Sequence, residues 1–251
     1  MDNKTALITG ATSGIGRATA NELAKHGFRL VLCGRRQERL DNIQTELNPI
    51  TQVHTLNFDV RDKKAVLRAI DSLPDTFKAI DILINNAGNA HGLDPIQDGE
   101  LEDWDAMIDI NVKGLLYVSK AIIPQMTKRQ TGHIINIGSS AGKEVYPKGN
   151  VYCASKHAVL AITDGMRIDL NPYGIKVSAI NPGLVETEFS KVRFKGDAVA
   201  DSVYKGYKAL QPEDIAEIIY FAISRPAHVT IADLLVFPTA QANSVTVKKD
   251  L

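Results

Sequence analysis

The sequence predicts an α/β protein with a doubly wound, seven-stranded parallel sheet flanked by helices. Short runs rich in β-branched residues alternate with segments of helical period, as in parallel sheets whose strands are joined by helices. Runs such as LVL and ILI are apolar throughout, which is typical of strands buried on both faces. The seven predicted strands span residues 5–10, 28–34, 52–60, 80–88, 133–138, 175–183 and 232–238.

The composition favours one domain that binds a small molecule. With 251 residues, 44% of them hydrophobic and 23% charged, the chain can bury the core of a single α/β domain, residues 1–251. Its 29 basic residues balance 29 acidic ones, so no bulk charge favours nucleic acid or an anionic membrane. A small-molecule partner is the better expectation.

The ends of the sequence and its cysteines favour a cytoplasmic protein. MDNKTALITG leads into an apolar run too short for a signal peptide or a membrane span, and the ending KKDL matches no organelle address. Cys33 and Cys153 have no metal-ligand or disulfide spacing, so we expect packing roles and no metal site.

The turn after the first strand predicts a dinucleotide-binding loop. It reads Thr9-Gly10-Ala11-Thr12-Ser13-Gly14-Ile15-Gly16 and opens a helix predicted to run to about His26. Gly10 permits a tight turn, Gly14 lets the backbone approach a pyrophosphate, and Gly16 allows close helix packing. The helix N-terminus adds free N–H groups and the positive end of its dipole. The alternative is a glycine-rich connector.

The second strand ends in a cationic pair. Arg35 and Arg36 stand where an NAD enzyme normally places an acid for the ribose 2′-hydroxyl, and no carboxylate occurs before Glu38. At the start of a helix predicted over 35–47, two arginines oppose the helix dipole unless they face an anion. A 2′-phosphate is such an anion, so we expect NADP rather than NAD. The alternative is a solvated pair of surface cations.

An ordered set of motifs at strand ends resembles the short-chain dehydrogenase/reductases. The set consists of TGxxxGxG, Asn85-Asn86-Ala87-Gly88, Ser139 and Tyr152-x-x-x-Lys156, and the match spans nearly the whole chain. Segments such as GHIINIGSSAG and NPGLVETEFSKVRFKGD are similar to the NADP-dependent 3-hydroxy acid dehydrogenases. That resemblance implies substrates of the serine, L-allo-threonine or malonic semialdehyde type, a Rossmann fold, and a homotetramer.

The resemblance implies a catalytic group of Asn111, Ser139, Tyr152 and Lys156. A free tyrosine has a pKa of about 10. We expect the Lys156 ammonium, one helical turn away, and a positive nicotinamide ring to favour the phenolate, so that Tyr152 becomes the general acid/base. Ser139 would hydrogen-bond the substrate oxygen, with the adjacent Ser140 as its competitor. Asn111, expected within a long helix, would hold a water that links Lys156 to solvent.

The family pattern also implies further cofactor contacts. These are Asp59 and Val60 beside the adenine, Asn86, Ala87 and Gly88 along the ribose, and Pro182, Gly183, Val185 and Thr187 near the nicotinamide. For Asp59 a role as a helix cap before Asp62 is equally expected.

Residues 184–210 interrupt the alternation of strands and helices and predict a substrate lid. Lys191, Arg193 and Lys195 lie within it, and Arg193 could bind a carboxylate through two parallel hydrogen bonds. A solvated charged loop or a tetramer contact is the alternative. The lid also holds a second YxxxK motif at Tyr204, which lacks the upstream serine and is interpreted as lid packing.

Two other functions remain open at this point. One is a short-chain reductase acting on a sugar, steroid or acyl-carrier ketone. The other is an NADP(H)-sensing protein without chemistry, which the complete set of Asn111, Ser139, Tyr152 and Lys156 disfavours.

Overall fold

A computed structural model describes residues 4–196 and 199–250 of the chain. In this part, seven strands form one parallel sheet in the order β3-β2-β1-β4-β5-β6-β7. The strands are β1 (Thr5–Thr9), β2 (Arg29–Gly34), β3 (Val53–Asn57), β4 (Ile82–Asn85), β5 (Gly132–Ile137), β6 (Ile175–Pro182) and β7 (Asp233–Val236). Six lie within their predicted runs and β5 begins one residue before its run, so the predicted sheet is confirmed.

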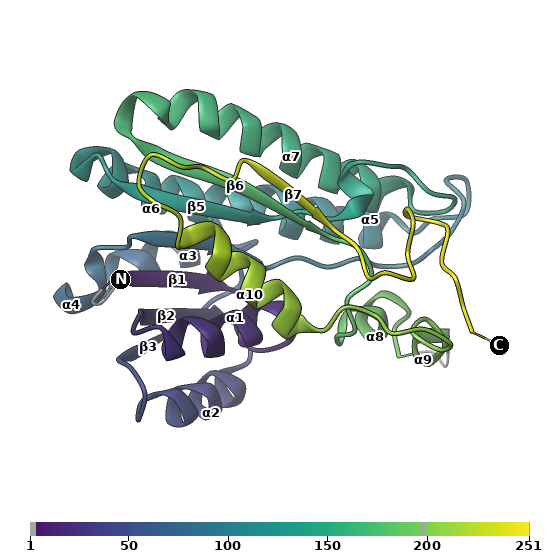
Figure 1. Cartoon of the computed structure of the whole chain (residues 1–251), viewed down its shortest axis with the longest axis horizontal. Coiled ribbons are helices and arrows are strands. Elements are labelled where there is room, and N and C mark those ends of the chain that lie inside the picture. Colours follow the sequence, from purple (N-terminus) through teal and green to yellow (C-terminus); the bar gives the residue numbers. More distant parts are fainter. Residues whose placement is uncertain (1–3, 197–198, 251) are drawn as a thin grey trace.

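Helices connect these strands (Figure 1). They are α1 (Gly14–Lys25), α2 (Gln37–Leu47), α3 (Lys63–Asp71), α4 (Asp75–Lys78), α5 (Leu101–Ile108), η1 (Asp109–Gly114), α6 (Leu115–Arg129), η2 (Ser140–Gly142), α7 (Asn150–Leu170), η3 (Asn171–Tyr173), α8 (Phe189–Arg193), α9 (Val199–Ser202) and α10 (Pro212–Ile223). Here η1 is a π-helix, while η2 and η3 are 3₁₀ helices.

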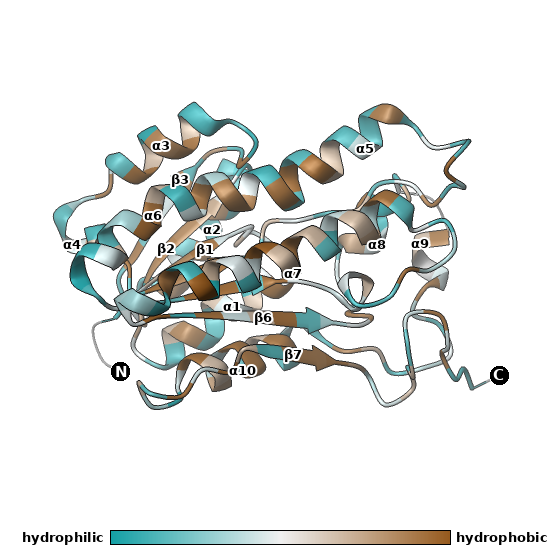
Figure 2. Cartoon of the chain, turned by 90° about the horizontal axis from the view of Figure 1, so that it is seen from above, coloured by the Kyte–Doolittle hydropathy of each residue, from teal (hydrophilic) through white to brown (hydrophobic). Residues whose placement is uncertain are grey.

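The alternation of side chains along each strand supplies a core on both faces of the sheet. Ile8 faces one cluster together with residues of α1, α2 and α10, whereas its neighbour Leu7 faces another with residues of α3, α4, α6 and α7. Turns of α3, α6 and α7 alternate between hydrophobic and hydrophilic colours in Figure 2, as expected of helices with one buried side.

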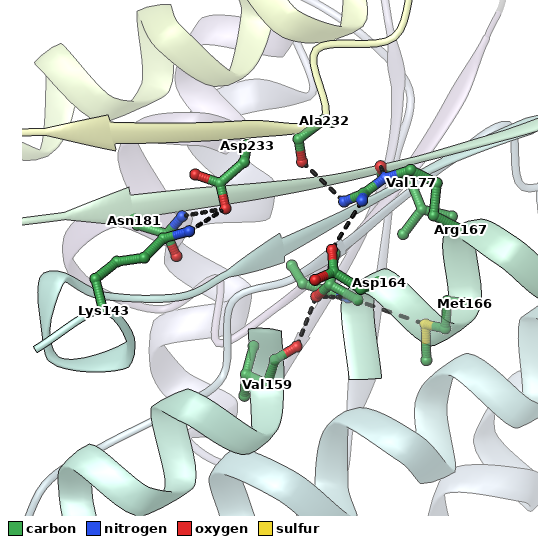
Figure 3. A network of polar contacts seen from close by, with 11 residues as sticks. Lys143, Val159, Asp164, Met166, Arg167, Val177, Asn181, Ala232 and Asp233 are labelled. Carbon is green, nitrogen blue, oxygen red and sulfur yellow. Dashed lines mark hydrogen bonds and ion pairs between the residues drawn. The ribbon is translucent and has the colours of Figure 1, made fainter. Parts of the chain in front are cut away.

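A polar network fixes α7 against β6 and the segment before β7 (Figure 3). Arg167 of α7 donates hydrogen bonds to the carbonyls of Val177 and Ala232, each at 3.0 Å. Lys143, just after η2, forms an ion pair of 2.7 Å with Asp233 at the start of β7. Because these bonds join the far end of α7 to the sheet, they set the direction in which its first turn projects.

The strand order reverses between β1 and β4, so the loops after these two strands leave toward opposite faces of the sheet. Ligands of doubly wound sheets bind in the crevice that forms at this point. In Figure 1, α8 and α9 lie beyond the carboxyl ends of the strands, at the same edge.

His133 gives the fold an expected sensitivity to acid. It is 2% exposed, its Nε2 lies 2.8 Å from Ser178 Oγ, and burial lowers its pKa to about 3. An unfolded histidine has a pKa of about 6.5, so below that pH the unfolded chain binds a proton that the folded chain does not. This contribution is intact above about pH 6.5 and should cost about 2 kcal/mol of folding free energy at pH 5.

Urea unfolding at pH 7 and pH 5 checks this. The chain should lose more stability between the two pH values than the His133→Gln variant, because titrating carboxylates elsewhere contribute equally to both. An identical loss in the two proteins would exclude His133 as the cause.

Candidate active site

The loop between β1 and α1 is shaped by glycines as the sequence predicts. Gly10 has a φ of +65° and Gly14 a φ of +50°, conformations that side chains other than glycine rarely adopt. A Cβ at Gly16 would lie 2.4 Å from the carbonyl oxygen of Gly10. Ser13 caps α1 by backbone position but makes no side-chain cap hydrogen bond with the described residues, which leaves first-turn N–H groups for an anion.

The loops after β1 and β4 are joined directly at the reversal of strand order. Thr9 Oγ1 accepts hydrogen bonds from the backbone N–H groups of Asn86 and Ala87, both at 3.0 Å. The Asn86 side chain donates back to the carbonyl of Thr9 at 2.9 Å. The structure therefore brings together the predicted cofactor residues of these two loops.

The two arginines after β2 lie beside the first loop. The Arg36 guanidinium donates to Thr12 Oγ1 at 3.0 Å and to Ser13 Oγ at 2.9 Å, while Arg35 pairs with Asp59 at 3.4 Å. The helix predicted from Arg35 begins instead at Gln37, with Arg36 as its N-cap. Both cations then precede the helix but still lie at the positive end of its dipole, where an anion such as Glu188 or Asp59 offsets them.

Glu188, which the sequence analysis did not single out, faces this cationic cluster. Its carboxylate lies 3.2 Å from Arg36 and 2.8 Å from Arg39, and these hydrogen bonds and charges hold the pKa of Glu188 below its ordinary value against the opposing effect of burial. The neighbouring Thr187 lies over Gly14, since a Cβ there would come within 3.2 Å of Thr187 Cγ2. The start of the lid segment thus meets the nucleotide loop.

Asp59 and Val60 follow β3, and the structure excludes one of the two roles expected of Asp59. Asp62 caps α3 by accepting from the N–H groups of Lys64 and Ala65, so Asp59 is not that cap. Asp59 instead pairs with Arg61 at 2.7 Å. The Val60 side chain is buried and packs on η1, which leaves only its backbone for a ligand.

Pro182, Gly183 and Val185 connect β6 to the lid segment. Pro182 is the last residue of β6, and a Cβ at Gly183 would lie 2.4 Å from Gln241 Oε1. Val185 is buried, pairs with Leu210 in an isolated bridge, and accepts a hydrogen bond from Tyr204 at 2.8 Å. Tyr204 of the second YxxxK motif therefore packs within residues 184–210, through Val185 and Ser190.

Asn111 lies in the π-helix η1, whereas the sequence suggests an ordinary long helix. π-helical turns are rare and frequent at functional sites. The buried side chain accepts from the N–H of Asn89 at 2.8 Å and donates to its carbonyl at 2.8 Å and to Ser155 Oγ at 3.0 Å. A Cβ at Gly88 would meet Asn111 Oδ1 at 3.0 Å and Lys156 Nζ at 3.5 Å, so these two groups flank Gly88.

Ser139, Tyr152 and Lys156 meet at the carboxyl end of β5. Ser139 follows this strand and lies close enough to Tyr152 to act against the rise in its pKa, and Tyr152 lies with Lys156 on the first turns of α7. Lys156 Nζ donates to the carbonyl of Ile137 at 2.9 Å. Ser140 is the first residue of η2; the contact with Tyr152 is made by Ser139, which supports Ser139 over its neighbour.

Burial governs both titrating groups of this cluster. It raises the pKa of Tyr152 above the ordinary value of a tyrosine, with Tyr146 adding to the effect, and it lowers the pKa of Lys156 to about 8. The expected lowering of the tyrosine pKa by Lys156 is therefore not found in the protein alone. The lysine is itself desolvated, which weakens the charge that was expected to act.

Arg193, at the end of α8, closes over Tyr152. It donates to Tyr146 Oη at 2.8 Å and to the carbonyl of Gly92 at 3.1 Å, and its guanidinium lies 5.5 Å from the centres of both tyrosine rings. The second amino group of its guanidinium makes no hydrogen bond with the described residues. A narrow pocket below it is lined by Tyr152 together with His91, Gly92, Trp104 and Lys148.

Most of this pocket wall is not predicted from the sequence. Asn89, His91 and Tyr146 contact the site only through the folding of loops that are distant in sequence, and no short motif marks them. Lys148 has a φ of +65°, which is unusual for a residue other than glycine, but no sequence pattern predicts this conformation.

Within residues 4–196 and 199–250, no helix is both long and apolar enough to cross a membrane. In the same ranges, no group of three or more His, Cys, Asp or Glu side chains is arranged to hold a metal ion.

Comparisons with known proteins agree with this architecture. The family model of short chain dehydrogenases matches residues 4–198. The chain is 47% identical over 238 residues to sulfoacetaldehyde reductase 2 of Chromohalobacter salexigens, covering 94% of each chain. It is 45% identical over 248 residues to the NADP-dependent 3-hydroxy acid dehydrogenase of Schizosaccharomyces pombe, covering 97% of this chain and 96% of the relative.

Among solved structures, the chain is similar to the closed form of serine dehydrogenase complexed with NADP⁺. The TM-score is 0.92 at 42% identity, over 98% of this chain and 100% of that one. These likenesses confirm the family that the ordered motifs indicate. The chain belongs to the short-chain dehydrogenase family.

Proposed function

We propose that the protein is an NADP-dependent oxidoreductase that transfers hydride between the nicotinamide and the 3-hydroxyl or 3-oxo group of a small 3-hydroxy acid. The observation that carries this proposal is the placement of the Ser139–Tyr152–Lys156 cluster at the strand ends, beside the loops after β1 and β4, with Arg193 closing the pocket above it. Its relatives named as 3-hydroxy acid dehydrogenases support the substrate class.

The residues present fit NADP. The glycines keep the loop in a tight conformation that other side chains would disrupt, and α1 offers first-turn N–H groups to a pyrophosphate. Arg36, Thr12 and Ser13 form a cluster of donors whose arginine already holds the Glu188 carboxylate, so a 2′-phosphate suits the same position. When bound, NADP exchanges the hydride with the carbon that carries the substrate oxygen.

The chain's own residues then position the substrate and move the proton. Ser139 orients the substrate oxygen next to the Tyr152 hydroxyl. Because burial favours neutral Tyr152, its phenol is poised to donate a proton to an oxygen that gains negative charge. Lys156, with a pKa of about 8, can hold or release a proton near neutral pH and so restore the phenol. Arg193 covers the tyrosine and limits the access of water.

A sulfonate substrate is a second candidate, favoured by the 47% identity to a sulfoacetaldehyde reductase. Both substrate classes combine an anionic group with a nearby carbonyl or hydroxyl. The free amino group of Arg193 suits either anion.

We further propose that residues 184–210 act as a substrate lid, that the chain forms a homotetramer as the family resemblance implies, and that it works in the cytoplasm on small molecules without a nucleic-acid or membrane partner. The lid proposal is supported by two contacts of this segment: Thr187, just before α8, lies over Gly14 of the nucleotide loop, and Arg193, at the end of α8, lies over Tyr152.

Replacing Tyr152 by phenylalanine tests the chemistry. The substitution removes the hydroxyl that carries the transferred proton and keeps the ring, so turnover of 3-hydroxypropionate with NADP⁺ should fall by roughly 10²- to 10⁴-fold. NADPH binding, measured by its fluorescence, should change little. Full activity of this variant would rule out Tyr152 as the general acid/base, and a complete lack of turnover of 3-hydroxy acids and sulfonates by the unmodified protein would rule out the proposed reaction.

Exchanging the arginines tests the cofactor. Arg35→Asp combined with Arg36→Ser removes the donors for a 2′-phosphate and supplies an acceptor for a ribose hydroxyl, so kcat/KM should shift at least about 100-fold from NADP⁺ toward NAD⁺. Arg17→Gln is the matched control, because Arg17 belongs to an exposed ion pair with Glu46 outside the site. An unchanged preference in the double variant would refute the assignment.

Arg193→Ala tests recognition of the acid group. Loss of a hydrogen bond to a carboxylate should raise the KM for 3-hydroxypropionate roughly 10-fold or more, and far more than the KM for a neutral alcohol of similar size. Lys191→Ala removes the same charge from an exposed position on α8 and should affect neither substrate. Equal effects of Arg193→Ala on acid and alcohol would indicate a purely structural role.

A further inference from the structure

Residues 89–92, here named the pocket strap, form one wall of the pocket and have no role in the reaction described above. The strap follows the Asn86-Ala87-Gly88 turn, and His91 lines the pocket together with Tyr152 and Arg193. His91 is partly buried, as expected of a side chain at a pocket wall.

The strap is held at both ends. The Asn111 side chain accepts from the N–H of Asn89 and donates to its carbonyl, both at 2.8 Å. At the other end, the N–H of Gly92 donates to the Arg193 carbonyl at 3.0 Å and the Gly92 carbonyl accepts from Arg193 Nε at 3.1 Å. His91 is therefore fixed between the catalytic asparagine and the lid.

The Asn89 side chain fixes the imidazole ring. Its Nδ2 lies 2.7 Å from His91 Nε2. In this orientation the Asn89 amide nitrogen donates, so Nε2 accepts; on that basis we assign a neutral ring with its proton on Nδ1. Asn89 Oδ1 is buried without a hydrogen-bond partner among the described residues.

The surroundings keep His91 neutral. Burial lowers its pKa, and the positive charges of Lys195, Arg35 and Arg61 act in the same direction against the opposing charge of Asp103. Asp103 is itself paired with Lys195 at 3.1 Å. The other carboxylates that line the pocket, Asp94 and Glu100, are exposed at its solvent side.

We propose that His91 is a specificity-determining residue whose Nδ1–H donates a hydrogen bond to the substituent on C2 of a three-carbon 3-hydroxy acid. This inference rests on the proposed function. In the proposed pose the carboxylate of the acid binds Arg193 and its C3 lies at Tyr152. The substituent on C2, which lies between these two groups, then faces the pocket strap. A 2-hydroxyl can accept this hydrogen bond, whereas a 2-ammonium can only donate and adds positive charge beside Arg193.

Glycerate and serine make a matched pair of substrates for the test, since they differ only in a hydroxyl or an ammonium group on C2. For the unmodified protein, kcat/KM with NADP⁺ should be at least about 10-fold higher for the preferred enantiomer of glycerate than for that of serine. In His91→Phe, which keeps a planar ring, this ratio should fall to within about threefold of one, mainly through a higher KM for glycerate.

Asn89→Leu provides a second test through the positioning of the ring. It leaves the backbone bonds of Asn89 to Asn111 in place but frees the ring to carry its proton on either nitrogen, so the ratio should also move toward one. His26→Phe is the matched control, because His26 stacks on Tyr220 at the end of α1 and should leave the ratio unchanged.

The outcomes separate the two proposals. Oxidation of 3-hydroxypropionate, which has no C2 substituent, tests the proposed function alone. If this acid is oxidised but the unmodified protein prefers serine, or if His91→Phe and Asn89→Leu both leave the ratio unchanged, the assignment of His91 is wrong. If none of the acids is oxidised, the proposed function fails first.

Discussion

The reversal of strand order between β1 and β4 is the constraint on which the rest of the site depends. The loops after these two strands leave in opposite directions. The Thr9 hydroxyl connects them by accepting hydrogen bonds from two backbone N–H groups of the loop after β4. Because these two hydrogen bonds fix the turn that ends at Gly88, they also position the pocket strap, which follows this turn in the chain. The nucleotide loop and the pocket wall are thus one connected structure.

Burial, more than charge pairing, sets the chemistry of the catalytic cluster. Tyr152 and Lys156 are both nearly inaccessible, and each is driven toward its neutral form. A neutral phenol beside a lysine that titrates near pH 8 suits proton transfer, because neither group is trapped in a charged state by a fixed partner. The only hydrogen bond of Lys156 among the described residues is to the carbonyl of Ile137, which orients the ammonium without neutralising it.

The sequence was sufficient for the sheet and for the placement of the residues in motifs at strand ends, because those motifs are local. Gly10, Gly16 and Arg36 lie where the pattern predicts. The start of α2 was misplaced by two residues, and the π-helical turn around Asn111 was missed, because both depend on tertiary packing that overrides local propensity. The pocket wall that contains His91 could not be predicted for a related reason. Its hydrogen-bond partners come from η1 and from residues 184–210, which are distant in sequence.

The short helix α8 connects the two halves of the site. It begins directly after Glu188, which is held by Arg36 and Arg39, and it ends at Arg193, which is held by Tyr146 and Gly92. A group that competes with Glu188 for Arg36 would weaken the contacts at the start of α8 and leave those of Arg193 at its end intact. An anion bound at Arg193 would act only on the contacts at the end of α8. Since Glu188 and Arg193 lie at the two ends of this five-residue helix, α8 is held beside the nucleotide loop at its start and over Tyr152 at its end.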